Sequence, residues 1–287
     1  MRLLDSRLKA FLKISQVGTV FGSAESLGVT QTAVTQRIRS LEEELGITLF
    51  TRSRKGMRLT VEGQALLQYC KGAEELEGAV FSKLSGKTQL AETHLTIAGP
   101  TSAMSFHFVK GASSVMKKHP GLYLHMLIDD HVTRVDLVRT DRAQLALVPP
   151  NQVPLEMDSK LLTPDKYILV CSPEWRGKKL EEILANERII DFYESDMTTL
   201  NYLTKFGLQS LVKKPRLYVN HNLPLIELLV AGIGYGTLTV NIAKPYLDSG
   251  ALITLNRGKV MEDPLALVWY PRPHMPEYFK ATIQSIR

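Results

Sequence analysis

Two short runs near the start of this 287-residue chain carry side chains that suit contact with a polyanion. Between Thr30 and Arg39, hydroxyl, amide and guanidinium groups are interspersed with apolar residues, and such groups can reach phosphates and base edges in a DNA major groove. Between Thr51 and Arg58, four of the eight residues are basic and none is acidic, which suits contact along a phosphate backbone. The candidate DNA-contacting residues are Thr30, Gln31, Thr32, Thr35, Gln36, Arg37, Arg52, Arg54 and Lys55.

Each of these residues also has a structural interpretation. Thr30 precedes a helical pattern and suits an N-cap, whether or not it also contacts DNA. Thr35 could be a surface hydroxyl, and the basic residues could be ordinary solvated charges. Their clustering directly after Leu49-Phe50 favours phosphate contact for the basic residues, whereas Glu42 is interpreted as structural or solvated rather than as a reader of bases.

A second set of polar side chains lies much later, at the ends of predicted strands. Thr101 and Ser102 follow a strand and begin a helix, so free backbone N–H groups and two hydroxyls suit a carboxylate ligand. Asp191 and Asp196 end another strand and would suit an ammonium group. The hydroxyls and the acids together indicate an amino acid or another carboxylate as the effector. Asn220 could line the same cleft. The alternatives are plain helix capping for these hydroxyls and acids and a loop role for Asn220.

Helical spacing explains how the early polar run would be presented. Apolar residues recur on one face of a first helix, and a second helix is expected from about Phe21 to Leu27, followed by a tight turn at Gly28. A third helix would begin at Thr30 and end at Gly46. Its buried stripe comprises Ala33, Val34, Ile38, Leu41 and Leu45. With a hairpin at Gly56 in the basic run, this order of elements predicts a winged helix-turn-helix.

This stretch resembles the LysR-type transcriptional regulator family over roughly residues 3–67. The matching residues are Ala24-Glu25-Ser26-Leu27, the run from Thr30 to Ile38, Leu41-Glu42, Leu45-Gly46, Leu49-Phe50, Arg52, Leu59-Thr60 and Gly63. The resemblance implies a winged helix-turn-helix that binds double-stranded DNA as a dimer. Two residues depart from the family pattern. Phe21 stands where the family usually has a Ser or Thr cap for the second helix, and Gln36 stands where many members have Arg, so the neighbouring Arg37 could supply the guanidinium.

A long helix is expected after the winged domain. Apolar residues follow steps of three and four, close to a coiled-coil seam, at Leu66, Tyr69, Ala73, Leu76, Val80 and Leu84. A helix of ~25 residues spans ~37 Å, which is too long for the short head to cover. We expect its start to pack on the head and its later part to pair with a second copy of the chain. Ser85–Gln89 is expected to be a hinge.

From residue 90 onward, short apolar strands alternate with helical segments, which is the pattern of an α/β fold. Strands are expected at His94–Ala98, Leu122–Ile128, Leu145–Val148, Tyr167–Cys171, Arg188–Phe192, Leu217–Val219, Tyr235–Val240 and Leu265–Trp269. Breaks at residues 149–154 and near 256–264 predict two subdomains with a cleft, a periplasmic-binding-protein-like arrangement. This layout is also similar to the regulatory domain of LysR-type proteins.

The expected domains follow from these breaks. Residues 1–60 form the winged helix-turn-helix, residues 61–89 the linker or dimerisation helix and hinge, and residues 90–287 the effector-binding regulatory domain. Within the last, subdomain I covers about 90–153 and 265–287, and subdomain II about 154–264. Charge agrees with this division, because residues 1–72 hold 11 Lys+Arg against 6 Asp+Glu whereas the remainder has a net charge of only +1.

No residue pattern typical of catalysis or metal binding is found. The chain lacks Gly-x-Ser-x-Gly and His-Glu-x-x-His, and its histidines have no metal-ligand spacing. Gly232–Gly236 lacks the Lys-Ser/Thr pair of a P-loop and is interpreted as a turn. The chain has only two cysteines, Cys70 and Cys171, and they are far apart in the sequence, which excludes a disulfide scaffold. We therefore expect no enzyme activity, metal or cofactor, and a cytoplasmic protein, since no membrane span or signal peptide is seen.

The sequence therefore predicts a DNA-binding transcriptional regulator that responds to a small molecule and acts as a dimer or a dimer of dimers. Two other classes of function fit the residues less well. A solute-binding module would leave the basic head without a role. An enzyme with a DNA-targeting domain would need a reactive set of residues in the cleft, and none is found.

Overall fold

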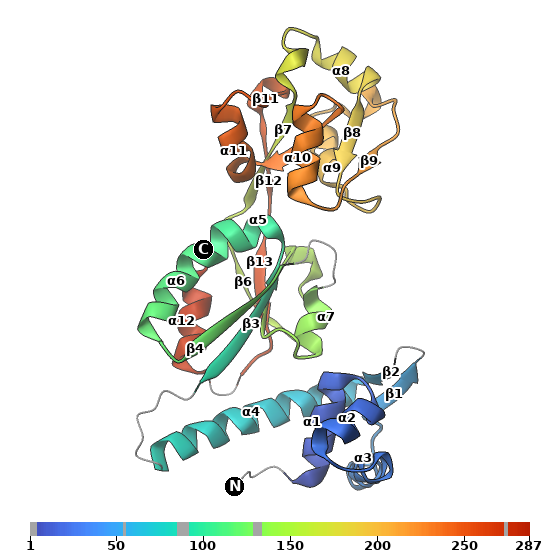
Figure 1. Ribbon diagram of the computed structural model, residues 1–287, viewed down its shortest axis with the longest axis vertical. Helices are drawn as coiled ribbons and strands as arrows, with labels where there is room; N and C mark the ends of the chain where they lie inside the picture. Colours follow the sequence, from blue (N-terminus) through green and yellow to red (C-terminus); the bar gives the residue numbers. More distant parts are fainter. Residues whose placement is uncertain (1–4, 54–55, 85–91, 129–133, 273–274) are drawn as a thin grey trace. The chain divides into compact units, whose positions relative to one another are not determined.

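The computed structural model describes residues 5–53, 56–84, 92–128, 134–272 and 275–287 (Figure 1). The chain divides into two compact units. The first comprises Met1–Gly99, Phe108–Lys160 and Ala266–Arg287, and the second comprises Pro100–His107 and Leu161–Leu265. Among the described residues, no helix is long and apolar enough to cross a membrane.

The N-terminal part of the first unit is a three-helix head with a hairpin. Its elements are α1 (Ser6–Val17), α2 (Val20–Leu27), α3 (Gln31–Leu45), β1 (Phe50–Ser53) and β2 (Gly56–Leu59). Apolar residues from all three helices and β1 form one core, in which Phe11, Val34 and Leu49 are fully buried. Asp5 caps α1, and the backbone N–H of Leu8 is the main reason that the pKa of Asp5 is lowered.

Helix α2 begins earlier than the sequence indicated. Its N-cap is Thr19, whose hydroxyl accepts a hydrogen bond from the Gly22 N–H at 3.2 Å. The expectation that Phe21 occupies the cap position is therefore wrong, because the cap lies two residues before it. Phe21 belongs to the first turn of α2 and is 65% exposed. Gly28 then takes the left-handed conformation, which a residue without a Cβ adopts with little strain.

The hairpin is fixed to the head at the start of α2. The Met57 N–H donates to the Gly18 carbonyl at 2.8 Å, and a Cβ on Gly56 would clash with that same carbonyl. Glu42 supports the strand before the turn, because its Oε1 accepts from Leu49 N at 2.6 Å. These contacts make the hairpin a wing with a defined position beside the helix-turn-helix.

A long helix, α4 (Val61–Leu84), follows the wing. Leu67 and Cys70 are buried against the head, whereas Tyr69 is 65% and Leu76 54% exposed. The early part of α4 thus packs on its own domain as expected, and its next turns present apolar groups to solvent. The predicted hinge, Ser85–Gln89, lies outside the described residues.

The remainder of the first unit is a five-stranded sheet of order β4-β3-β5-β13-β6. Its elements are β3 (Thr93–Gly99), α6 (Val109–Lys118), β4 (Leu122–Ile128), α7 (Arg134–Arg139), β5 (Leu145–Val148), η2 (Pro150–Gln152), β6 (Asp158–Leu161), β13 (Ala266–Trp269) and α12 (Glu277–Ser285). Helix α7 packs on one face through Val135 and Val138. Helices α6 and α12 lie side by side, with Gly111 against the Ser285 carbonyl.

The second unit is built on a sheet of order β11-β7-β10-β8-β9, with β12 also paired to β7. Its elements are α5 (Thr101–Ala103), η1 (Met104–Phe108), β7 (Asp165–Cys171), η3 (Pro173–Trp175), α8 (Leu180–Asn186), β8 (Arg188–Asp191), α9 (Thr198–Lys205), η4 (Gln209–Leu211), β9 (Leu217–Tyr218), α10 (Asn222–Val230), β10 (Gly234–Thr239), α11 (Val240–Asp248), β11 (Ile253–Thr254), η5 (Asn256–Gly258) and β12 (Val260–Asp263).

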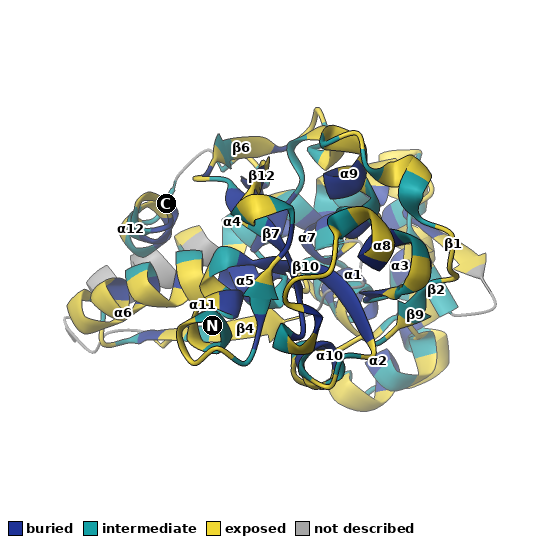
Figure 2. Ribbon diagram, turned by 90° about the horizontal axis from the view of Figure 1, so that it is seen from above, coloured by how far each residue is buried: buried dark blue, intermediate teal, exposed yellow. Residues whose placement is uncertain are grey.

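Each face of this second sheet is covered by a different pair of helices. Helices α8 and α9 bury Leu169 and Tyr235 on one face, and α10 and α11 bury Val170 and Leu238 on the other. Figure 2 shows β7 and β10 as mostly buried strands. Strands β8 and β10 run parallel, so their carboxyl ends meet at one edge of the sheet.

The α/β fold expected from the sequence is confirmed, with small differences at strand ends. Val240, expected at the end of a strand, is the first residue of α11. Three short strands, β6, β11 and β12, were not expected. Strand β6 is mostly polar and β12 is half polar, so both lack the apolar run that marks a buried strand.

Candidate functional site

The polar side of α3 faces away from the core of the head. Val34, Ile38 and Leu41 are buried, whereas the opposite side is open to solvent. Thr30, Gln31, Thr32, Thr35 and Gln36 are exposed, and Arg37 is half-buried. The Thr30 hydroxyl accepts from Ala33 N at 3.1 Å, so this residue is an N-cap whose exposed position still allows contact with a ligand. The helix therefore presents donors and acceptors along one continuous side.

The wing adds basic residues beside this helix. Arg52 and Arg58 are exposed on its two strands, in the antiparallel register Arg52↔Met57 and Thr51↔Arg58. Arg54 and Lys55 lie outside the described residues. Glu42 does not belong to the polar side, because its carboxylate is occupied by backbone N–H groups at the start of the wing.

In the second unit, Ser102 is brought to a carboxylate that the sequence did not single out. Ser102 Oγ donates to Asp165 Oδ2 at 3.0 Å, and His107 Nε2 lies 2.9 Å from Asp165 Oδ1. The residue that caps α5 is Pro100, without a side-chain bond, so neither Thr101 nor Ser102 acts as the N-cap. Ser102 is buried and Thr101 half-buried. Chain segment 100–107 is thus fastened to the start of β7.

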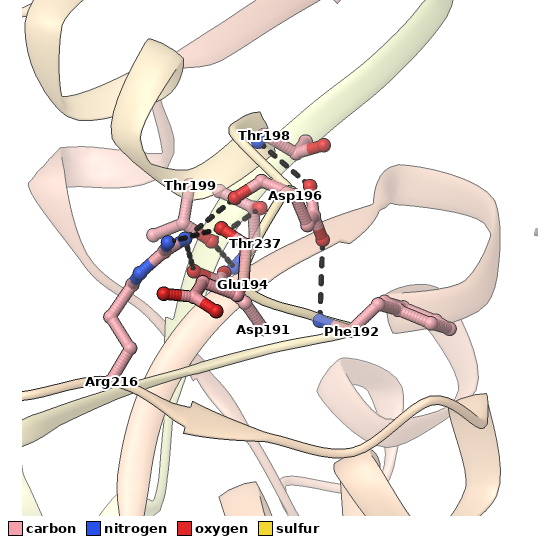
Figure 3. Close-up of polar contacts among 8 residues, drawn as sticks. All are labelled: Asp191, Phe192, Glu194, Asp196, Thr198, Thr199, Arg216 and Thr237. Carbon is pink, nitrogen blue, oxygen red and sulfur yellow. Dashed lines mark hydrogen bonds and ion pairs between the residues drawn. The ribbon is translucent and has the colours of Figure 1, made fainter. Parts of the chain in front are cut away.

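Asp191 forms a buried ion pair with Arg216 (Figure 3). Arg216 Nη1 donates to Asp191 Oδ2 at 2.9 Å and to the Asp196 carbonyl at 2.6 Å, and Nη2 donates to the Glu194 carbonyl at 2.6 Å. Burial raises the pKa of Asp191, and hydrogen bonds from Thr199 and Arg216 oppose that rise only in part. At 2% exposure, this carboxylate is satisfied by the protein itself.

Asp196 holds the start of α9. Its Oδ1 accepts from Thr198 N at 2.9 Å and its Oδ2 from Phe192 N at 3.2 Å, as the capping alternative described (Figure 3). Asn220 is exposed in the turn between β9 and α10, next to His221, which caps α10. The effector role of Asp191, Asp196 and Asn220 stays a prediction.

A second pair of acids lies at one edge of the same sheet, at the first residue of one strand and the last residue of its neighbour. Asp165 begins β7 and Asp263 ends β12, and the two are direct partners in an antiparallel register. Burial raises the pKa of Asp263, and the negative charges of Asp165 and Asp196 raise it further. The sequence carried a weak signal for this pair, since each acid adjoins a proline at a strand end, in Pro164-Asp165 and Asp263-Pro264.

A winged helix-turn-helix followed by an α/β region with two separate sheets is the architecture of a ligand-responsive DNA-binding regulator. Comparison with known families agrees with this class. Residues 6–64 match the bacterial regulatory helix-turn-helix protein, lysR family, and residues 88–287 match the LysR substrate binding domain. The chain belongs to the LysR family, and it is a DNA-binding transcriptional regulator with an effector-binding domain.

Individual relatives cover nearly the whole chain. ArgP of Aeromonas salmonicida is 25% identical over 276 residues, covering 92% of this chain and 90% of its own. HdfR of Salmonella dublin is 27% identical over 263 residues, covering 91% and 90%. Both are HTH-type transcriptional regulators.

Solved structures show the same fold at lower identity. ArgP from Mycobacterium tuberculosis superposes with a TM-score of 0.79 at 21% identity, covering 99% of this chain and 97% of that one. Full-length LysG from Corynebacterium glutamicum with bound effector Arg superposes with a TM-score of 0.74 at 19% identity, covering 98% and 95%.

Proposed function

We propose that α3 enters the major groove of an operator and that the wing holds the adjacent phosphate backbone. The observation that carries this proposal is the separation of the two sides of α3, with an apolar stripe in the core and an unbroken polar side in solvent. In this arrangement Gln31, Thr32 and Arg37 contact base edges, and Thr30, Thr35, Gln36 and the wing residues position the helix. Arg54 and Lys55, which follow Arg52 in the same basic run of the sequence, extend the phosphate contacts.

The phosphate role of the wing is tested by salt dependence. Arg52→Ala should weaken binding to every DNA sequence and reduce the slope of log K against log salt by about 0.9 for each phosphate that Arg52 neutralises. Arg176→Ala is the matched control, because Arg176 is also exposed but lies in the second unit. An unchanged slope for Arg52→Ala, measured by fluorescence anisotropy on the DNA upstream of the gene, rejects the phosphate role.

Base recognition is tested by comparing specific with random DNA. Gln31→Ala and Arg37→Ala should each reduce the preference for the operator by about 1–3 kcal/mol while leaving random-sequence binding nearly unchanged. Equal losses on both kinds of DNA would assign these side chains to phosphates or to the fold instead.

We further propose that α4 pairs two copies of the chain. Tyr69 and Leu76 are large apolar groups exposed on one helix, and a second copy of the same helix would cover them. A dimer also presents two recognition helices to a two-fold operator, and dimers could associate further into a dimer of dimers. Light scattering of Leu76→Glu, with a change at another exposed leucine, Leu155→Glu, as control, tests the α4 interface: only the first should shift the mass toward the monomer.

We propose that the effector is an amino acid or another small carboxylate, and that it binds the regulator while the regulator is on DNA. We also propose that the protein acts in the cytoplasm. A similar protein has been solved with its effector Arg, and another relative is named ArgP. In this chain, Thr101 and Ser102 together with the acids at the carboxyl ends of the strands supply groups for both ends of such a molecule. Calorimetry of the full chain with the common amino acids, followed by a gel shift with each binder, tests the proposal. Absence of heat for all of them would refute an amino acid effector without affecting DNA recognition.

A further inference from the structure

Two carboxylates face each other on adjacent strands at one edge of the second sheet. Asp165 and Asp263 are directly paired in the antiparallel ladder between β7 and β12 (Figure 1). Directly opposite residues on such strands have their side chains on the same face of the sheet, and like charges in that position destabilise the pairing. A pair of this kind is therefore expected to have positive groups around it.

Only one member of the pair has hydrogen-bonding side chains beside it among the described residues. Asp165 is bonded on one oxygen to Ser102 and on the other to His107. For Asp263, the described part of the chain supplies neither a hydrogen-bond donor nor a cation, and the charges that act on it come from Asp165 and Asp196. Because Asp263 keeps an exposed surface, a ligand from solution can reach it.

A buried hydroxyl on the other neighbour of β7 lies on the same face of the sheet. Thr239 ends β10 and is only 4% exposed, yet its Oγ1 has no hydrogen-bond partner among the described residues. Its partner across the ladder is Tyr167, two residues after Asp165, so strand alternation places Thr239, Asp165 and Asp263 on one face of the sheet. Buried hydroxyls without a partner are costly and rare, so Thr239 has a free hydrogen-bonding group to offer to a molecule from outside the chain.

The chemistry of these groups selects the class of ligand. Two carboxylates and a hydroxyl offer several acceptors and a negative charge, and they require a cation that donates hydrogen bonds. A metal ion is disfavoured, because the described residues contain no group of three or more His, Cys, Asp or Glu that could hold one. We propose that Asp263, Asp165 and Thr239 form a subsite for an ammonium or guanidinium group of the effector. Asp263 makes the direct charge-assisted contact.

This subsite rests on the proposed small-molecule function and narrows it to cationic effectors. The test is calorimetry of the full-length protein with L-arginine, L-lysine and L-citrulline, the last being a neutral analogue of arginine. The wild-type protein should bind at least one of the two cationic amino acids and bind citrulline about tenfold or more weakly. Asp263→Asn should remove that preference.

Glu262→Gln is the matched control. Glu262 is the neighbouring residue on β12 and is exposed, and its Oε1 lies 3.6 Å from Lys166 Nζ on the opposite face of the ladder. This change removes the same charge from the same strand and should leave affinity unchanged. Thr239→Val serves as a second probe, because it removes the unpartnered hydroxyl and keeps the shape. It should weaken binding of the cationic amino acid without lowering the melting temperature, a result that a purely structural hydroxyl would not give.

Three results would overturn the subsite. One is equal binding of citrulline and the cationic amino acids, which would leave an amino acid effector in place. Another is unchanged affinity in Asp263→Asn, or an equal loss in Glu262→Gln. The third is absence of binding by all three amino acids, which would reject cationic amino acids as effectors. In every case a gel shift with the unliganded protein tests DNA binding, and with it the regulatory function, separately from the subsite.

Discussion

Replacing Arg216 with Met should destabilise the second unit more than any change of a surface ion pair. In the folded protein this guanidinium donates to the Asp191 carboxylate and to two carbonyls, at 2.6–2.9 Å. Methionine keeps much of the length and removes every donor. Asp191, at 2% exposure, would then retain the hydrogen bond from Thr199 as its remaining side-chain partner among the described residues.

The expected size follows from what remains buried. Breaking a buried pair by removing one partner costs about 3–5 kcal/mol, whereas an exposed pair is worth about 0–1 kcal/mol. The Arg216–Asp191 pair belongs to the first case, since its side chains are 15% and 2% exposed. The double variant Asp191→Asn with Arg216→Met has no buried charge to leave unpaired, so it should recover about 1–3 kcal/mol of the loss.

The loss should also depend on pH. Burial already raises the pKa of Asp191 above its unfolded value, and removal of Arg216 takes away a group that lowers it. For a carboxylate with a raised pKa, the cost of ionisation is absent below the unfolded pKa and complete above the folded pKa. The deficit of Arg216→Met should therefore be largest near neutral pH and shrink as the pH falls toward the pKa of a free aspartate.

Urea unfolding measured by Trp175 fluorescence is the assay, since Trp175 is buried in the core under α8 and α9. A Trp269→Phe background removes the signal of the first unit. With an m-value of about 2 kcal/mol/M, the midpoint should fall by about 1.5–2.5 M. A loss below about 1 kcal/mol, or a double variant whose loss equals the sum of the single losses, would refute the reasoning.

Three further changes probe the head and the buried thiols. Glu42→Ala leaves two backbone N–H groups before the wing without their acceptor and should lower head stability by about 1–3 kcal/mol, measured by hydrogen exchange; no change would show that water replaces the carboxylate. Gly56→Ala should weaken DNA binding while α-helical circular dichroism is retained, because its Cβ would clash with the Gly18 carbonyl. Burial raises the pKa of Cys70 to about 11 and that of Cys171 to about 12, so neither thiol should react with a disulfide reagent at pH 8 until urea is added.

The head was largely predictable because its signals are local. Glycines at residues 28 and 46 do adopt the left-handed conformation at helix ends, and Thr30 does cap α3. The start of α2 was misplaced because the cap was assigned to Phe21, the position where the family has it. Thr19, which has a hydroxyl suited to capping, lies two residues earlier. Local sequence thus identifies a cap type more easily than its exact register.

The arrangement around Asp191 was not predictable, because its partner is 25 residues away in the chain. Sequence position identified the acid at the end of a strand and gave no sign of the arginine that neutralises it. The pairing of Asp165 with Asp263 was not predictable for the same reason, since β12 is short and half polar and its register with β7 exists only in the folded sheet. Chemistry that depends on pairing across strands is decided by tertiary structure.

The position of β13 in the first sheet has a consequence for the order in which the protein matures on the ribosome. This strand lies between β5 and β6, yet in the chain it follows the whole second unit. The second unit, which ends at Leu265, is completely synthesised before the sheet that precedes it can close. A nascent chain therefore carries an open β5 edge until β13 has been synthesised, and a premature stop after residue 265 would spare the second unit while leaving the first without its inner strand.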